Sequence, residues 1–450
     1  MNVLVLNGSP KGDYSITLQT VLYLEKINPQ KTFTILNVGQ RIKALESDFT
    51  PAMEAIKNAD VLLFAYPVYT FIAPCQLHRF IELMKEHNVP VEGKFVTQIT
   101  TSKHFYDVTA HRYIQDNCQD MHMKFVHGLS ADMEDLTTEQ GQKEARNFWR
   151  HFCWCVKNDY YETSYSKTII PANKPVSIPT QSAKQLDCND EVVIVTDCTP
   201  TDTSLNDMIA RFQAKLPLKS RIVNISEYPF IGGCLGCFNC ATDGVCIYKD
   251  GFDSFLRDKI QTAQTIVYAF TIKDHSMGSR FKMYDDRQFC NGHRTVTMGM
   301  PVGYLVSGNL SEEENLRTII DARAQVGGNI LAGVATDEFD PDKDIDKLAA
   351  SVVYALQNKN LQPQNFYGIG GMKIFRDLIY QMRGMMKADH QFYKEHGQYD
   401  FPQKEIGTVL KMYLIGALIS SPKVKSKMGN KMNEGMIAPY RKVIERAGKK

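Results

Sequence analysis

The chain has 450 residues, 43% hydrophobic and 23% charged, which is enough for two domains with separate cores. The formal net charge is only +2, so no strong field favours nucleic acid or an anionic membrane. The eleven cysteines are odd in number and partly clustered, which favours free thiols and ligands in a reducing cytoplasm. No charged and then apolar leader precedes Val3, so we expect no secretory signal. The apolar run 409–419 is too short to cross a bilayer.

The N-terminal stretch predicts a strand, a polar loop and a helix. Residues 3–6 are an apolar run typical of a strand buried on both faces, and apolar residues recur at helical spacing from Ser15 onward. A loop in this place offers backbone N–H groups and the positive end of a helix dipole, which favour an anion. Spacing excludes both G-x-x-x-x-G-K-[ST] and G-x-G-x-x-G. We therefore expect a nucleotide phosphate here, held by Lys11, hydroxyl groups and loop amides.

A second loop of this kind follows the strand predicted at 59–65. It reads PVYTFIAP over 67–74 and leads into a helix that starts CQLHRFIE. The two loops resemble those of the flavodoxin-like NAD(P)H-dependent FMN reductases and iron-sulfur flavoproteins. Their first loop reads G-S-P-basic and then S/N-x-T, and their second reads P-V-Y-W-G-x-x-x-x-Q-L-K-x-F-I-D. Thr70 and Phe71 depart from this pattern, which has Trp and Gly there. The resemblance implies bound FMN, with NAD(P)H as the electron donor.

The expected flavin site joins these two loops to the polar end of a strand predicted at 94–101. All of them follow strands, as ligand loops in open parallel sheets do. No side chain is nominated as an acid or base, because the flavin supplies the chemistry. The residues expected to bind the cofactor are Ser9, Lys11, Ser15, Ile16, Thr17, Pro67, Val68, Tyr69, Thr70, Phe71, Ile72, Thr101 and Ser102.

The pattern of strands and helices starts again after residue 190, and residues 125–132 align with 330–337. Residues 163–190 are rich in Pro, Ser, Thr and Asn, as linkers are. We predict an α/β chain with two flavodoxin-like, doubly wound, parallel five-stranded sheets in tandem. The expected parts are an FMN-binding domain at 1–162, a linker at 163–190, a degenerate second domain at 191–362 and a helical C-terminal extension at 363–450. Within them we expect a fifth strand at 124–129, second-domain strands at 191–196, 221–225, 265–270, 303–307 and 329–334, and a helical run at 375–387.

The second copy has lost both flavin loops and gained a cysteine run. Asp197 and Asp202 stand where its phosphate loop belongs, and like charge repels a phosphate, so we expect no FMN there. The run C-x2-C-x2-C-x5-C offers soft thiolate ligands for a metal or a cluster. It resembles the compact motif that holds a [4Fe-4S] cluster in iron-sulfur flavoproteins, and a structural zinc or free thiols remain alternatives. The expected ligands are Cys234, Cys237, Cys240 and Cys246.

Together these features predict an FMN-dependent oxidoreductase or electron-transfer flavoprotein that uses NAD(P)H and relays electrons through a cluster in its second domain. The alternative is a non-enzymatic electron carrier or flavin-based redox sensor with a structural metal site. We expect a small-molecule or protein electron donor or acceptor as partner, no nucleic acid and no membrane, with a homodimer as one option. The expected location is the cytoplasm.

Overall fold

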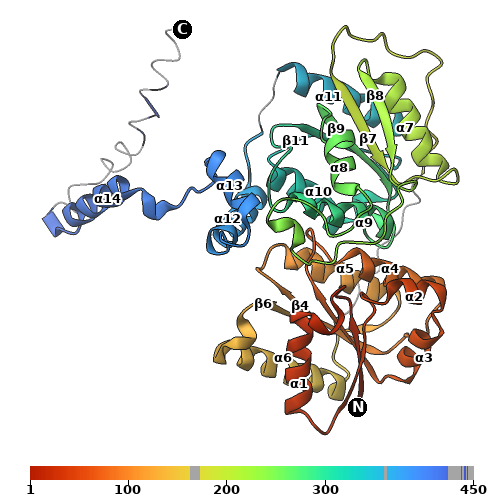
Figure 1. Ribbon diagram of the computed structural model, residues 1–450, viewed down its shortest axis with the longest axis vertical. Helices are drawn as coiled ribbons and strands as arrows, with labels where there is room; N and C mark the ends of the chain where they lie inside the picture. Colours follow the sequence, from red (N-terminus) through yellow and green to blue (C-terminus); the bar gives the residue numbers. More distant parts are fainter. Residues whose placement is uncertain (163–172, 359–361, 424–436, 438–439, 442, 444–450) are drawn as a thin grey trace. The chain divides into compact units, whose positions relative to one another are not determined.

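The computed structural model describes residues 1–162, 173–358, 362–423, 437, 440, 441 and 443. Its first parallel sheet has the order β2-β1-β3-β4-β5, with β6 beside β4, and helices on both faces (Figure 1). The strands are β1 (Asn2–Asn7), β2 (Thr32–Leu36), β3 (Val61–Pro67), β4 (Phe95–Ser102), β5 (Lys124–Phe125) and β6 (Leu129–Asp132). The helices are α1 (Ile16–Ile27), α2 (Ile42–Ser47), α3 (Thr50–Asn58), α4 (Cys75–Glu86), α5 (Asp107–Asp120) and α6 (Glu139–Asn158).

The second parallel sheet repeats this topology, with the order β11-β10-β9-β7-β8. Its strands are β7 (Glu191–Thr196), β8 (Lys219–Asn224), β9 (Thr265–Thr271), β10 (Pro301–Ser307) and β11 (Ile330–Thr336). Its helices are α7 (Thr203–Lys215), α8 (Phe252–Phe255), α9 (Gly278–Arg287), α10 (Glu314–Gly327) and α11 (Pro341–Asn358). The prediction of two flavodoxin-like sheets in tandem is confirmed.

The prediction of one continuous strand at 124–129 is wrong. The strand is split into β5 and β6, and both of them pair with β4. Between them Gly128 packs so closely on β4 that an added Cβ would lie 2.4 Å from Cγ of Gln98. The Gln98 side chain is itself fixed by hydrogen bonds to Tyr66 and to the carbonyl of His111. The chain therefore leaves the ladder after Phe125 to pass this side chain, and it pairs with β4 again from Leu129.

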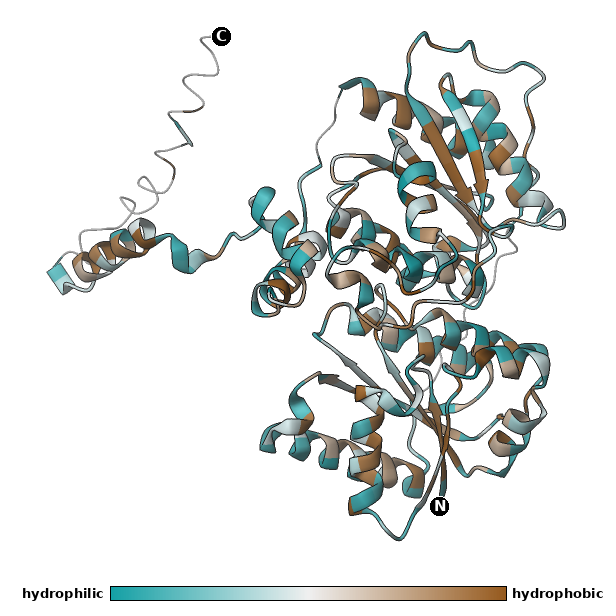
Figure 2. Cartoon of the chain, viewed as in Figure 1, coloured by the Kyte–Doolittle hydropathy of each residue, from teal (hydrophilic) through white to brown (hydrophobic). Residues whose placement is uncertain are grey.

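The central strands of each sheet are buried on both faces, which is why β1, β3, β7 and β9 contain long apolar runs (Figure 2). In β1, Leu4 and Leu6 belong to the core on one side of the sheet, and Val3 and Val5 belong to the core on the other. All four are at most 1% exposed. The side-chain alternation of a strand thus fills two cores per sheet, and it leaves the polar loops at the ends of the strands.

The C-terminal part is helical, as predicted, with α12 (Phe366–Gln381), α13 (Lys387–Glu395) and α14 (Ile406–Ile419). The helical run expected at 375–387 has different limits: α12 begins at Phe366, because Asn365 caps it by accepting a hydrogen bond from N–H of Tyr367 at 2.9 Å. It ends at Gln381, before a turn. α12 packs against α10.

The chain divides into two compact units, residues 1–392 and 393–450. Within the described residues no helix is long and apolar enough to cross a membrane, and α14, the most apolar of them, has 14 residues (Figure 2). Residues 163–172 of the predicted linker and most of 424–450 lie outside the described part. The domain limits at 162, 190 and 362 stay predictions.

Candidate functional site

A cavity of about 390 Å³ lies where β1, β3 and β4 of the first sheet end. Its other walls come from the second domain and from α12 and α13. All of the predicted flavin residues except one line it: Ser9, Lys11, Ser15, Ile16, Thr17, Pro67, Val68, Tyr69, Thr70, Phe71, Thr101 and Ser102. The exception is Ile72, which is fully buried in the core beneath the cavity.

We call the loop after β1, residues 8–15, the phosphate loop after its predicted role. It is held in shape by Asn7, whose Nδ2 donates hydrogen bonds to the carbonyl of Gly12 at 2.9 Å and to Oδ1 of Asn37 at 2.8 Å. The loop ends at Ser15, which caps α1 by accepting a hydrogen bond from N–H of Leu18 at 3.3 Å. The first turn of a twelve-residue helix thus opens onto the cavity, which is a favourable place for an anion.

Two hydroxyl groups on the cavity wall lack a hydrogen-bond partner among the described residues. They belong to Thr17, which is 1% exposed, and to Thr101, which is 6% exposed. A buried hydroxyl without a partner costs about 1–3 kcal/mol. A ligand with acceptor oxygens would satisfy both, and the two hydroxyls lie on the same cavity as the N-terminus of α1. These groups therefore fit FMN, which carries a phosphate and polar ring atoms.

The loop after β3, residues 67–74, is the flavin loop. It contains a tight turn in which Tyr69 and Ile72 exchange backbone hydrogen bonds of 2.7 and 3.1 Å. Within the turn Thr70 has φ 45° and Phe71 has φ 73°. This is the left-handed region, which residues other than Gly adopt at a cost. The geometry explains why a Gly suits position 71 in the resembling families, and it requires this chain to hold a Phe there by outside contacts.

The loop of residues 232–246, the cysteine loop, packs directly on both first-domain loops. Gly236 has φ 60°, and an added Cβ would lie 1.8 Å from Oη of Tyr69 and 3.4 Å from Cε of Lys11. At Gly233 an added Cβ would lie 2.2 Å from Sγ of Cys75. No side chain fits at either position, so the glycines permit contact between the two domains. All four predicted ligand cysteines line the same cavity as the flavin residues.

Two arginines, of which Arg287 is buried, hold the cysteine loop at its ends. Arg287 is 2% exposed and donates hydrogen bonds of 2.7 and 2.8 Å to the carboxylate of Asp250 and of 2.9 Å to the carbonyl of Gly232. Its Nη2 lies 3.8 Å from Sγ of Cys246. Arg257 donates to the carbonyl of Gly244 at 2.6 Å. A positive environment of this kind favours thiolates and a negatively charged cluster.

Burial acts against ionisation of the same thiols. It raises the pKa of Cys234 well above its usual value and raises the pKa of Cys240 to about 11. Within the described residues, no group of three or more His, Cys, Asp or Glu side chains is arranged to hold a metal ion. The donor set of four thiols beside two guanidinium groups fits a soft metal cluster by its chemistry, whereas its sulfur atoms are not arranged as a ligand cage.

The sequence patterns did not point to the cavity wall that the second domain and the C-terminal helices supply. His293 lies there between aromatic rings, 4.6 Å from the ring centre of Phe375, and its Nδ1 is 3.2 Å from Oδ2 of the buried Asp389. Arg323 and Phe289 complete this wall. These residues belong to no local motif and are brought together by packing between distant segments, so only a prediction of how the two copies dock would have found them.

The corresponding place in the second domain holds carboxylates. The fully buried Asp337 accepts hydrogen bonds of 2.6 Å from Ser204 and from Ser307 and of 2.8 Å from N–H of Gly308. Burial raises the pKa of Asp197 to about 7. Donors that a phosphate needs are thus already used by a side chain of the protein. This arrangement supports the prediction that the second copy does not bind FMN.

Comparison with known proteins agrees with the loop motifs. Residues 1–131 match the family described as NADPH-dependent FMN reductase. A curated relative, an iron-sulfur flavoprotein from Archaeoglobus fulgidus, is 24% identical over 178 residues, which is 37% of this chain and 80% of that protein.

Two solved structures are also similar. FerB, a flavoenzyme NAD(P)H:(acceptor) oxidoreductase from Paracoccus denitrificans, has a TM-score of 0.30 and 17% identity, over 35% of this chain and 97% of that one. An NAD(P)H:quinone oxidoreductase from Methanothermobacter marburgensis has a TM-score of 0.28 and 12% identity, over 37% of this chain and 99% of that one. The family match supports the expectation of an oxidoreductase. The resemblance to the NADPH-dependent FMN reductases and to an iron-sulfur flavoprotein is thereby confirmed, the former over residues 1–131.

Proposed function

We propose that this protein is an FMN-dependent oxidoreductase that takes electrons from NAD(P)H and passes them to an acceptor by way of the cysteine loop. Bound FMN supplies the redox chemistry, because it exchanges electrons with a nicotinamide in pairs and with other centres singly. The alternative of a non-enzymatic carrier or sensor is not favoured by the match to a reductase family.

The residues of the first domain bind and orient the cofactor. The N-terminus of α1, with Ser9, Lys11 and Ser15, holds the phosphate, and Thr17 donates its otherwise unpaired hydroxyl. The flavin loop and Thr101 line the ring. The cavity wall from the second domain excludes water from the ring.

One observation carries the proposed relay: the cysteine loop and the flavin loop are in direct contact at Gly236 and Tyr69. A cluster on Cys234, Cys237, Cys240 and Cys246 would then share the cavity with the flavin. Such a cluster would supply single-electron transfer to or from the flavin within that cavity.

The flavin part is tested with the isosteric variant Thr17→Val, which removes the unpaired hydroxyl and keeps the volume. We expect its Kd for FMN to rise about tenfold or more, since a phosphate oxygen of the bound cofactor would then lose the hydroxyl donor. NAD(P)H oxidation falls with it. Thr20→Val is the matched control, because Thr20 is buried on the same helix but does not line this cavity. Unchanged FMN binding by Thr17→Val contradicts the assignment.

The relay is tested by iron and labile-sulfide analysis of the anaerobically purified chain. We expect about four irons and four sulfides per chain. The exposed Cys237, changed to Ser, should abolish them, and Cys153→Ser, on α6 outside the loop, should not. Zinc in place of iron, or no metal at all in the wild-type protein, would remove the relay and leave the flavin assignment standing.

A further inference from the structure

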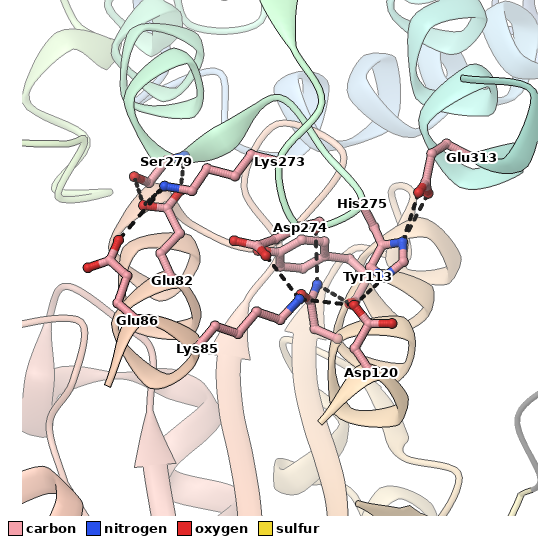
Figure 3. Close-up of polar contacts among 11 residues, drawn as sticks. Glu82, Lys85, Glu86, Tyr113, Asp120, Lys273, Asp274, His275, Ser279 and Glu313 are labelled. Atoms are coloured by element: carbon pink, nitrogen blue, oxygen red, sulfur yellow. Dashed lines mark hydrogen bonds and ion pairs between the residues drawn. The ribbon is translucent and has the colours of Figure 1, made fainter. Parts of the chain in front are cut away.

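Helices α4 and α9 lie side by side. Each helix has a carboxylate that accepts a hydrogen bond from a backbone N–H group at the start of the other helix. Glu82 of α4 accepts hydrogen bonds from N–H and Oγ of Ser279 of α9, at 2.8 and 2.7 Å (Figure 3). Asp286 of α9 accepts one from N–H of Cys75 of α4, at 2.8 Å. These residues occupy equivalent positions of the two copies, so the copies dock with an internal pseudo-twofold symmetry.

The side chains of α9 contact the flavin loop as well as the start of α4. Asp286 also accepts a hydrogen bond from Oγ1 of Thr70, at 3.1 Å. Lys282, one turn earlier on α9, forms an ion pair with Asp286 and donates a hydrogen bond to the carbonyl of Tyr69, at 3.1 Å. Lys282 and Asp286 are both fully buried. A buried charge pair of the second domain thus contacts two consecutive residues of the flavin loop.

A second ion pair, Arg323 with the buried Asp285, contacts the next residue of the loop. Arg323 donates a hydrogen bond to Asp285 at 3.0 Å, and its guanidinium lies 5.4 Å from the ring centre of Phe71. The contacted residues include Thr70 and Phe71, the two that adopt the left-handed conformation. Residues in that region keep it only where their surroundings determine it. Phe71 also packs against Phe105 and Tyr106 of its own domain, whereas the side-chain hydrogen bonds to Thr70 and to the carbonyl of Tyr69 come from α9.

The equivalent loop of the second domain has the same backbone conformation, but its side chains make different contacts. Asp274 and His275 have φ 51° and 63°, at the positions that correspond to Thr70 and Phe71. They face Lys85 and Asp120 of the first domain and do not line the cavity (Figure 3). The symmetric contacts therefore lead to a flavin site on one side only.

We propose that Lys282 and Asp286 are positioning residues for the flavin loop, so that the second domain completes the flavin site of the first. The inference rests on the proposed function. The second domain has lost its own flavin loops, but its charged side chains hold the strained turn of the first domain's flavin loop, which would line the ring. Flavin affinity then depends on residues that do not touch the flavin.

The pseudo-symmetry supplies a matched pair of isosteric variants, Asp286→Asn and Glu82→Gln, in the full-length chain. Each weakens one of the two equivalent contacts at the same interface. We expect Asp286→Asn to raise the Kd for FMN about tenfold or more and to shift the visible absorption bands of the bound flavin. We expect Glu82→Gln to leave the Kd within about twofold and the bands unchanged, even where both variants lose similar thermal stability.

A double variant, Lys282→Met with Asp286→Asn, guards against misfolding, since it leaves no unpaired buried charge. It should show the same loss of FMN affinity with a native circular dichroism spectrum. Equal effects of Asp286→Asn and Glu82→Gln on FMN binding, or unchanged binding in the double variant, would overturn the positioning role while the proposed function stands. A wild-type chain that binds no FMN would overturn both.

Discussion

His275 of the second domain donates a hydrogen bond from Nε2 to the carboxylate of Asp120 of the first, at 2.9 Å (Figure 3). Its other ring nitrogen, Nδ1, lies 3.0 Å from Glu313 at the start of α10. Burial lowers the pKa of His275, but the hydrogen bonds to these two carboxylates outweigh it and raise that pKa to about 10. The imidazole is therefore charged at neutral pH, and it joins the two domains.

This contact predicts a pH-dependent stability. The pKa of His275 is raised above the unfolded value of about 6.5, so its stabilisation is complete below that pH and is lost as the pH rises through about 10. We expect His275→Gln to lower the free energy of unfolding by about 2 kcal/mol at pH 6. The difference from the wild type should shrink toward pH 10. Thermal melts followed by circular dichroism measure it.

His127→Gln is the control for that series, because the His127 side chain is 76% exposed. Its melting temperature should follow the wild type across the range. A His275→Gln defect of the same size at pH 6 and pH 10 would show that the imidazole acts by its shape alone.

Replacing Asp197 should have the opposite effect to replacing His275, because it should stabilise the folded protein. Burial raises its pKa to about 7, so the folded protein is favoured while the carboxyl is neutral, and this advantage is lost as the pH rises from about 3.8 through 7. We expect Asp197→Asn to be more stable than the wild type by about 1 kcal/mol at pH 8 and no more stable at pH 4. Asp187→Asn, at an exposed position, is the comparison. A gain that does not depend on pH argues against a buried charge.

Gly236 and Gly93 separate backbone strain from contact between the loops. Both have positive φ, 60° and 74°, so Ala should cost each about 1 kcal/mol of stability. Only at Gly236 does the added Cβ meet Tyr69, whereas nothing lies within 4 Å of it at Gly93. We expect Gly236→Ala to change the visible spectrum of bound FMN and to slow NAD(P)H oxidation. Gly93→Ala should do neither, and equal spectra for the two variants would refute close contact between the loops.

Local patterns were enough to predict each sheet. Unbroken apolar runs such as 3–6 mark strands covered on both faces, and Ser15 marks the start of α1. The same patterns failed where a tertiary contact decides the local structure. The break between β5 and β6 depends on a side chain of β4, Gln98, which the sequence around residues 126–128 does not reveal.

The candidate site was predictable on one side only. Loop motifs identified most of the first-domain wall but missed Lys103, Phe105 and Met133, and they included Ile72, which the turn of the flavin loop directs into the core. The opposite wall, with Arg323 and His293, forms when the two copies dock, and no spacing within either copy encodes that. The equivalence of Glu82 and Asp286 becomes apparent only from the contact between α4 and α9.

The count of FMN molecules per chain tests the central asymmetry between the two copies most directly. The full-length protein, titrated with FMN and followed by its absorption spectrum, should bind one FMN per chain. Thr17→Val should raise the Kd of that site about tenfold or more, and Ser204→Ala, which alters the corresponding place in the second domain, should leave it unchanged. Two FMN molecules per chain, or a single FMN whose Kd is unchanged in Thr17→Val and raised in Ser204→Ala, would contradict the account.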